Sequence, residues 1–325
     1  ANNSVAYKFK PEIGTFMREW VSLYESKSGE RGIFNRASAI KQAEKNGRRD
    51  TKHNFGCNPC SEIILRPYQI CNLSEVVARA SDNMESLRNK VRIATILGTF
   101  QATMTDFKYL RKVWQKNTEE ERLLGVSLTG IMDNQILSGQ SATYGMNISA
   151  LLEELKAVAV ETNKSFASTL GIAQSTAITC VKPSGTVSQL VDSSSGIHAR
   201  HNDYYIRTVR GDNKDPLTQF LIGEGIYNEP DMMKPDSVTV FSFPMQSPDR
   251  AVLRGDITAI EQLELWKVYA LHWCEHKPSV TISVREEEWM DVGAWVYENF
   301  DIASGVSFLP HSDHTYQQAP YQDIE

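Results

Sequence analysis

Apolar residues recur at helical spacing in several stretches of the chain, and each such stretch predicts an amphipathic helix. The first runs over 11–26, where Phe16 and Trp20 lie on one face. Asn147 is placed to cap a long helix that ends at Gly171. The same spacing predicts further helices over 36–46, 83–106, 118–134, 258–275 and 286–299.

Short runs rich in β-branched and aromatic residues predict strands between these helices. They lie at 5–9, 176–181, 237–243, 279–284 and 305–309. Strands that alternate with helices are typical of an α/β architecture with mostly parallel strands. The segment 55–73 is expected to be a loop with extended pieces, because Pro59 and Pro67 disfavour a regular helix. With neither a repeat nor a clear linker, we expect one α/β layer structure.

Composition narrows the class of protein. The chain has 325 residues, 41% hydrophobic and 23% charged, which predicts a sizeable folded core. Its net charge of −6 argues against a broad surface for nucleic acid. No stretch approaches the roughly 20 apolar residues that cross a bilayer, and no signal peptide is evident, so no membrane contact is expected. A start at Ala1 rather than Met suggests a processed end or part of a longer polypeptide.

The cysteines are the first candidates for chemistry. An odd number, five, without a secretion signal indicates a reducing compartment and thiol chemistry. Cys57, Cys60 and Cys71 lie within fifteen residues of one another. A zinc site could use the first two with His198 and His201, but no second CxxC pair supports it. A redox CxxC normally opens a helix after a strand, whereas strand-like residues follow here.

A third interpretation is a reactive cysteine flanked by an amide and a carboxylate. In an extended segment, residues two apart point the same way, so Asn58, Cys60 and Glu62 would face one pocket. An amide that orients a substrate, a thiol that reacts and a carboxylate that moves protons form a coherent group. Cys180 and Cys274 lie in apolar segments and are expected to pack in the core.

The stretch 182–188, Lys-Pro-Ser-Gly-Thr-Val-Ser, is a candidate phosphate loop. It follows the predicted strand 176–181, and Gly185 would let the backbone approach a ligand closely. A helix starting there would aim free N–H groups at a phosphate. The stretch is not a Walker motif, and taken alone it could simply be a turn.

These motifs together resemble those of ribonucleotide reductases. Asn-Pro-Cys-Ser-Glu resembles the Asn-x-Cys-x-Glu finger loop of that family, and Cys71 follows Cys60 by eleven residues in an Ile-Cys-Asn-Leu-Ser setting. The resemblance implies that Cys60 is the thiyl radical that removes the ribose 3′ hydrogen. Glu62 would be the general base on the 3′ hydroxyl, and Asn58 would bind the substrate hydroxyls. Cys71 would be one half of the reducing dithiol.

The resemblance is most specific to class II reductases of the triphosphate type. The stretches that carry it are 28–36, 60–76, 178–190, 194–210, 277–284 and 304–321. It implies adenosylcobalamin as cofactor, with no metal held by the chain itself. It further implies a ribonucleoside triphosphate substrate, a thioredoxin-type reductant and a cytoplasmic location. Phosphate binding is carried over to Ser184, Gly185, Thr186, Val187 and Ser188.

The fold implied is a ten-stranded α/β barrel of two five-stranded halves, with the finger loop threaded through its centre. Residues 1–325 would form one partial catalytic barrel domain, the C-terminal half, with the finger loop at about 55–75. The N-terminal half, with the partner of Cys71, would be supplied in cis or in trans. The alternatives are a class I diphosphate-reductase large subunit, a non-catalytic nucleotide-binding remnant and a zinc-binding interaction module.

Overall fold

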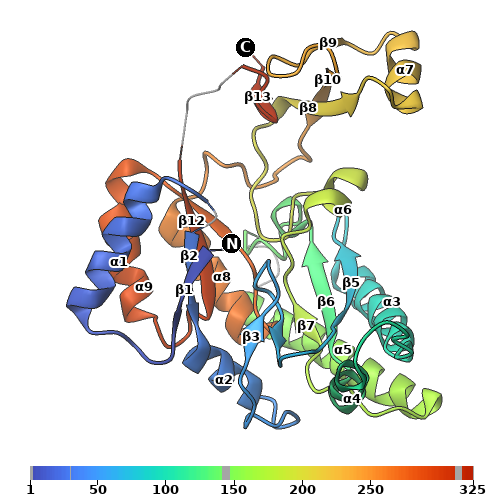
Figure 1. Ribbon diagram of the computed structural model, residues 1–325, viewed down its shortest axis with the longest axis vertical. Helices are drawn as coiled ribbons and strands as arrows, with labels where there is room; N and C mark the ends of the chain where they lie inside the picture. The colour runs from blue at the N-terminus through green and yellow to red at the C-terminus, as the bar shows by residue number, and fades with distance from the viewer. Residues whose placement is uncertain (1–2, 30, 141–146, 312–316, 325) are drawn as a thin grey trace.

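The computed structural model describes residues 3–29, 31–140, 147–311 and 317–324 (Figure 1). Two sheets joined edge to edge form the body of the protein, and a smaller antiparallel lobe stands above them. Part of the last motif, 312–316, lies outside the described residues. The α/β architecture expected from the alternation of strands and helices is therefore present.

The first sheet brings the two ends of the body together. Across the sheet its strands are β1 (Asn3–Tyr7), β2 (Arg31–Asn35), β12 (Gly305–Pro310) and β11 (Thr281–Val284). Strand β2 is parallel to β1 but antiparallel to β12, which in turn is parallel to β11. Helices α1 (Ile13–Ser26) and α9 (Trp289–Glu298) cover its outer side (Figure 1), while α2 (Arg36–Glu44) follows β2.

Aromatic side chains hold these helices to the first sheet. The Trp20 ring of α1 lies 4.9 Å from the Phe308 ring of β12 and 5.6 Å from the Trp289 ring of α9, measured between centroids. The Trp20 indole N–H also donates to the Trp289 carbonyl at 3.0 Å. Such buried rings contribute about 1.5–3 kcal/mol each through the area they remove from water.

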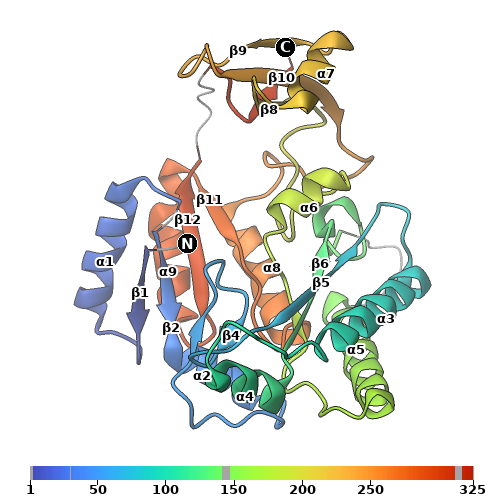
Figure 2. The same ribbon diagram turned by 45° about the vertical axis from the view of Figure 1, so that its right-hand side comes forward.

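The second sheet is entirely parallel. Its strands are β5 (Asn72–Val77), β6 (Leu124–Thr129) and β7 (Thr179–Cys180), in that order. Helices α3 (Met84–Gln101) and α5 (Ile148–Leu170) pack together over one side of it (Figure 2), and α4 (Lys112–Glu121) precedes β6. A short 3₁₀ helix, η1 (Ile131–Asp133), follows β6.

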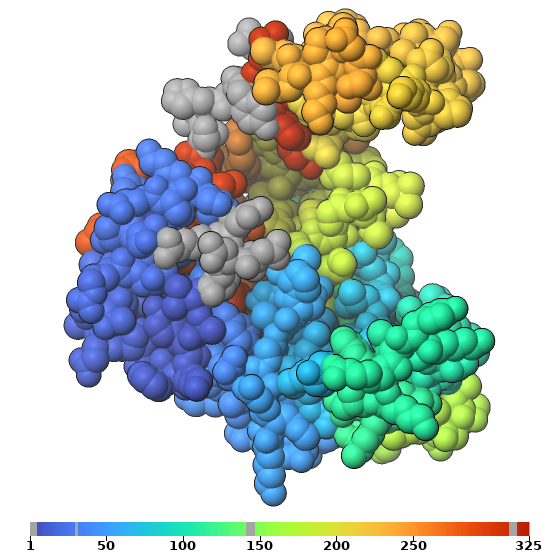
Figure 3. Space-filling model, viewed as in Figure 1, coloured from blue at the N-terminus to red at the C-terminus, as the bar shows by residue number. Residues whose placement is uncertain are grey.

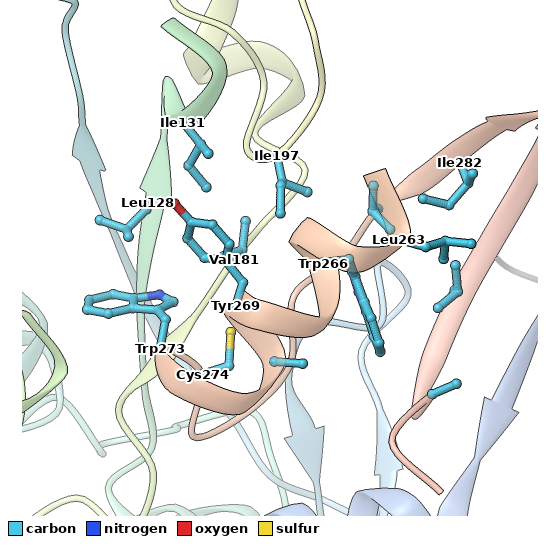
Figure 4. Close-up of a cluster of buried hydrophobic side chains, with 14 of the residues drawn as sticks. Leu128, Ile131, Val181, Ile197, Leu263, Trp266, Tyr269, Trp273, Cys274 and Ile282 are labelled. Carbon is cyan, nitrogen blue, oxygen red and sulfur yellow. The ribbon is translucent and has the colours of Figure 1, made fainter. Parts of the chain in front are cut away.

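The two sheets meet beyond the end of β7. Val181 forms a parallel bridge with Pro278, and Val181 exchanges backbone hydrogen bonds with Lys277 and Ser279. Five strands, β5-β6-β7-β11-β12, therefore run in one direction, with β2 reversed beside them. Helix α8 (Ala259–His272) packs against this junction (Figure 4). Its Trp266 and Tyr269 are fully buried among side chains of both sheets.

The lobe consists of an antiparallel sheet in the strand order β13-β8-β10-β9. These strands are β13 (Tyr321–Asp323), β8 (Tyr204–Asp212), β10 (Val238–Gln246) and β9 (Asn228–Pro230), with α7 (Pro216–Gly223) beside them. Figure 3 shows its yellow and orange surface projecting above the body. A buried ion pair anchors its base, since Arg200 lies 2.9 Å from Asp133 of η1 and donates to the Tyr205 hydroxyl.

Most predicted helices are present, and their ends follow the predicted signals. The Asn147 side chain accepts from the Ser149 N–H at 3.0 Å, and Gly171 ends α5 in the left-handed conformation with φ of 67°. Thr258 and Glu261 form a reciprocal capping box at the start of α8. A 3₁₀ turn, η3 (Glu286–Glu288), leads into α9.

The helix predicted over 118–134 is wrong. Helix α4 ends at Glu121, and the next segment is strand β6, whose six residues are all buried. A strand that is covered on both faces has a continuous run of apolar residues without alternation. Its sequence pattern therefore resembles that of a buried helix. The strand over 237–243 is present as β10, but it is antiparallel to β8, a strand that the pattern did not reveal.

Candidate active site

Cys60 lies at the tip of a short hairpin between the two sheets. Strands β3 (Gly56–Cys57) and β4 (Ile64–Leu65) pair antiparallel, and we call residues 58–63 between them the hairpin tip. The Asn58 N–H donates to the Ile63 carbonyl at 3.3 Å. Ser61 adopts a positive φ of 69°, which a residue with a side chain adopts only when its surroundings hold it there.

The extended geometry expected for residues 58–62 is wrong, because this segment turns. The Asn58 Oδ1 atom accepts from the Ile63 N–H at 3.0 Å, so this side chain shapes the hairpin tip itself. Cys60 is half-buried and lines a cavity, whereas Glu62 is fully buried. The three side chains share one hairpin tip without pointing the same way.

Glu62 is a buried carboxyl group with unused hydrogen-bonding capacity. Neither of its carboxylate oxygens has a hydrogen-bond partner within the described part of the chain. Buried polar atoms in native proteins are nearly always paired, and exceptions concentrate at functional sites. A carboxylate held in this way is suited to accept a hydrogen bond or a proton from a ligand hydroxyl.

Cys71 lies immediately before β5 and close to Glu62. Burial raises the pKa of the Cys71 thiol, and the negative charge of Glu62 raises it further. The same two causes raise the pKa of Cys180 on β7, which the structure buries as the sequence predicted. At neutral pH both sulfurs therefore carry their protons, and Cys71 is a hydrogen donor rather than a thiolate nucleophile.

The candidate phosphate loop connects β7 to the six-residue helix α6 (Gly185–Leu190). Ser184 and Ser188 are buried, and the Ser188 hydroxyl donates to the Gly185 carbonyl at 3.1 Å. Residues 185–187 are exposed. A Cβ atom added at Gly185 would meet no atom within 4 Å, so space for a ligand lies directly above the backbone there.

Two adjoining cavities connect the loop to the hairpin tip. The smaller, about 90 Å³, is lined by Cys60 and Ser61 together with Pro183 and Thr281. The larger, about 600 Å³, shares Pro183 and Thr281 and extends toward the lobe. Its polar lining includes Gln189, Ser195, His198, Arg200, His201, Arg254, Gln262, Ser283, Arg285, His311 and Tyr321. Of the predicted loop, Pro183 lines both cavities, whereas none of residues 184–188 is among the lining of either one.

His198 forms part of the wall between β11 and the segment after α6. Its Nδ1 atom lies 2.8 Å from the Ser195 carbonyl, and its Nε2 atom lies 3.1 Å from the Thr281 N–H. Nδ1 is therefore the protonated nitrogen, and Nε2 accepts. Burial lowers the pKa of His198, so the neutral ring joins two wall segments at neutral pH.

A second group of residues positions the hairpin, and the motifs did not reveal it. The buried Arg49 guanidinium donates to the Ile64 carbonyl and pairs with Glu121 of α4, both at 2.9 Å. His276 and Lys277, just before β11, are also buried and contact the hairpin. The only sequence signal was that Lys277 begins the reductase-like stretch 277–284, which assigns the residue no role.

Comparison with known proteins supports the resemblance predicted from the motifs. No model of a protein family matches the chain. The adenosylcobalamin-dependent ribonucleoside-triphosphate reductase of Lacticaseibacillus paracasei is 26% identical over 358 residues, covering 100% of this chain and 46% of the relative. The probable adenosylcobalamin-dependent ribonucleoside-triphosphate reductase of Dictyostelium discoideum is 30% identical over 280 residues, covering 83% of this chain and 35% of the relative.

Solved structures show the same relationship at the level of the fold. A vitamin B12-dependent (class II) ribonucleotide reductase matches with a TM-score of 0.79 and 22% identity, over 100% of this chain and 48% of its own. The class Id ribonucleotide reductase α subunit of Actinobacillus ureae matches with a TM-score of 0.58 and 12% identity, over 91% of this chain and 61% of its own.

The fold is therefore that of ribonucleotide reductase catalytic chains. Within that class, the chain is homologous to the adenosylcobalamin-dependent ribonucleoside-triphosphate reductases, and the predicted resemblance to class II is confirmed. The chain spans less than half the length of these curated relatives.

Proposed function

We propose that this chain forms the part of a class II ribonucleotide reductase that carries the reactive cysteine and binds the substrate. The observation that carries the proposal is that Cys60 at the hairpin tip and Pro183 of the phosphate loop line the same small cavity. In a homologue of ribonucleoside-triphosphate reductases, a thiol at this cavity would lie beside a bound nucleotide.

The chemistry of each side chain at the hairpin tip supports a separate role in the reaction. As a thiyl radical, Cys60 would take the 3′ hydrogen of the ribose and return it at the end of the reaction. Glu62, with its unpartnered oxygens, would accept the proton of the 3′ hydroxyl. Asn58 shapes the hairpin tip, and its amide N–H₂ group would bind the substrate hydroxyls.

Cys71 would supply reducing equivalents. Its raised pKa keeps the sulfur protonated, as a donor of hydrogen to the 2′ position requires. In the overall reaction the substrate loses its 2′ hydroxyl as water, and two thiols become one disulfide, so electrons and protons balance. All five cysteines in the chain are free thiols, which fits a reducing, cytoplasmic location and re-reduction by a thioredoxin-type protein.

The sheet arrangement supports a half-barrel. Five strands, β5-β6-β7-β11-β12, run in one direction, and β2 and β1 begin a second, reversed set. A ten-stranded barrel of two five-stranded halves has this arrangement at each junction of its halves. The β3–β4 hairpin would be its finger loop, and the remaining strands would come from another part of the reductase, in cis or in trans.

The exposed backbone at 185–187 would hold the substrate phosphates. The first N–H groups of α6 have no partner within the helix, and Ser184, Thr186 and Ser188 add hydroxyls nearby. Val187 would contribute its backbone only. Burial raises the pKa of Glu75, which lies beside Ser184.

Adenosylcobalamin, the cofactor of the homologues, would lie against the larger cavity rather than inside it, because the cofactor is bulkier than a space of about 600 Å³. The cofactor would bring its cobalt in its own ring. Gln189, Gln262 and Arg285 line the cavity and would bind its amide side chains. When bound, adenosylcobalamin would supply the radical equivalent that oxidises the Cys60 thiol.

The experiment replaces each cysteine in a reductase reconstituted from this chain and the rest of the catalytic protein. We expect Cys60→Ser to abolish reduction of a ribonucleoside triphosphate with adenosylcobalamin. Cys71→Ser should stop repeated turnover, since no disulfide can then be cycled. Cys274→Ser, at a buried site on the far side of β7, is the control and should stay active. Full multiple turnover in Cys60→Ser would refute the proposal.

A further inference from the structure

The segment 277–279, between α8 and β11, contacts the hairpin tip through its first and last residues. The Ser279 hydroxyl donates to the Cys60 carbonyl at 2.6 Å. The Lys277 backbone N–H donates to the Glu62 carbonyl at 3.0 Å, and its Nζ donates to the Ser61 Oγ at 2.9 Å. Residues 60–62 are therefore each bonded to Lys277 or Ser279.

Lys277 is the unusual member of this segment, because it is a lysine that is only 1% exposed. A buried ammonium is costly unless it is paired, and no carboxylate within the described residues lies at ion-pair distance from it. Its contacts are the Ser61 hydroxyl, the Ser304 carbonyl at 3.3 Å and the face of the Phe34 ring at 4.7 Å. One of the hydrogen bonds that the buried ammonium donates therefore goes to the hairpin tip.

The surrounding backbone leaves room for this contact and for nothing larger. A Cβ atom added at Gly305 of β12 would lie 2.4 Å from the Ser61 Oγ and 2.8 Å from the Lys277 Nζ. Ser61 is the residue with the positive φ of 69°, a conformation that costs about 1 kcal/mol or more for a residue with a Cβ. The lysine therefore holds the strained residue next to the reactive cysteine.

Lys277 also faces the buried carboxyl group of the hairpin tip. The charges of Cys57 and Glu62 act on the ammonium and favour its protonated form against the effect of burial. His276, the neighbouring imidazole, accepts from the Ile64 N–H through Nδ1 at 3.3 Å, and burial keeps its pKa well below the ordinary value. Lys277 is thus a buried cation whose backbone is bonded to that of the residue proposed as the base.

We propose that Lys277 is a positioning residue that holds Ser61 in its left-handed conformation and so fixes the Cys60 sulfur at the mouth of the small cavity. The proposal rests on the proposed function only for the role given to Cys60. The geometric claim concerns the thiol itself and can be tested on this chain without nucleotide reduction.

The test measures alkylation of individual cysteines by iodoacetamide in the folded chain, resolved by mass spectrometry. We expect Lys277→Met to change the rate at Cys60 by roughly tenfold relative to the wild-type chain, equivalent to about 1.4 kcal/mol in activation free energy. Ser61→Ala should do the same, and the double variant should show no further change, because both remove one bond. A structural effect of each substitution on its own would instead add in the double variant.

Lys267→Met is the matched control, since Lys267 also donates to a neutral acceptor, the Asn299 Oδ1, but lies away from the hairpin tip. It should leave the Cys60 rate unchanged. If Lys277→Met does not fold, the alkylation rate of Cys60 in Ser61→Ala, which removes a single oxygen, tests the proposal. An unchanged Cys60 rate in folded Ser61→Ala would overturn the proposal, whatever the outcome of the Cys60→Ser activity test.

Discussion

Gly185 can carry a larger side chain without disturbing the chain around it. An added Cβ meets nothing within 4 Å, and the residue does not have a positive φ. We therefore expect Gly185→Val to leave the far-ultraviolet spectrum unchanged while filling the space above the loop. Loss of about 1.5 kcal/mol of charged hydrogen bonding should weaken ribonucleoside triphosphate binding roughly tenfold.

The binding constant can be measured by calorimetry on the folded chain. Gly223→Val is the control, because a Cβ at Gly223 at the end of α7 also meets nothing within 4 Å, far from the loop. Equal affinity in the two variants would remove the phosphate role from residues 185–187.

Lys277 gives the stability of the protein a pH dependence of known sign. Burial lowers its pKa from about 10.5 to about 8 in the folded state. Between these values the unfolded chain binds a proton that the folded chain does not, so the free energy of unfolding rises with pH in this window. Below about pH 8, where the buried lysine is charged, its burial lowers the free energy of unfolding.

The effect is isolated by comparison with Lys277→Met, which lacks the titrating group. The difference in unfolding free energy, wild type minus variant, should rise by roughly 3 kcal/mol between about pH 8 and 10.5. Urea unfolding at several pH values measures it. A difference that stays constant would mean that Lys277 titrates at its ordinary pKa.

The sequence predicts the reactive side chains of this site but not the residues that hold them. Asn58, Cys60 and Glu62 are recognisable because their chemistry is encoded within five consecutive positions. Lys277 lies far along the chain, and nothing local marks it as buried, since its burial comes entirely from tertiary contacts with the hairpin. Nor could local spacing reveal that the hairpin tip turns at Ser61.

At the scale of elements, strand β6 is where the sequence pattern wrongly predicted a helix. Its close packing also limits which residues the strand can carry. Its six residues are buried because strands β5 and β7 flank it and helices cover it. Gly125 is the second residue of β6, where a Cβ would be 2.4 Å from a Leu73 methyl and 3.3 Å from the Cys180 sulfur. A glycine is needed here because neighbouring side chains pack closely against the backbone, not because the chain turns.

Gly125→Ala should therefore destabilise the protein by about 1–3 kcal/mol through overpacking. Chemical denaturation would report the change as a lower midpoint with an unchanged slope. Gly56→Ala, at a strand position where a Cβ meets nothing within 4 Å, should be close to neutral. A neutral Gly125→Ala would show that the β5–β6–β7 packing is looser than described.

At the scale of the whole molecule, the site is open on one side. The outer edge of β5, beside Cys71, pairs with no other described strand. All five cysteines are free thiols, so Cys71 is not joined to a partner in this structure. The curated relatives are more than twice as long as the chain, and we propose that the second thiol and further strands come from the additional part of such a reductase.

We therefore expect the purified chain alone to give no sustained reduction of a ribonucleoside triphosphate with adenosylcobalamin and dithiothreitol. Activity should appear when the remaining part of the reductase is added. Product formation, measured by chromatography of deoxynucleotides, tests this directly. Sustained turnover by residues 1–325 alone would place a second redox thiol within them and refute the half-barrel.

The pairing of β2 with β12 delays folding of the first sheet during biosynthesis. Phe34 lies opposite Gly305, so the first sheet cannot form until nearly the whole chain has left the ribosome. At 5–20 residues per second, strand β2 waits roughly 15 to 55 seconds for its partner. During that time Phe34 and the apolar face of α1 lack their final cover. The nascent chain thus exposes apolar residues near its beginning, of the kind that chaperones bind, until the last strands of the body emerge.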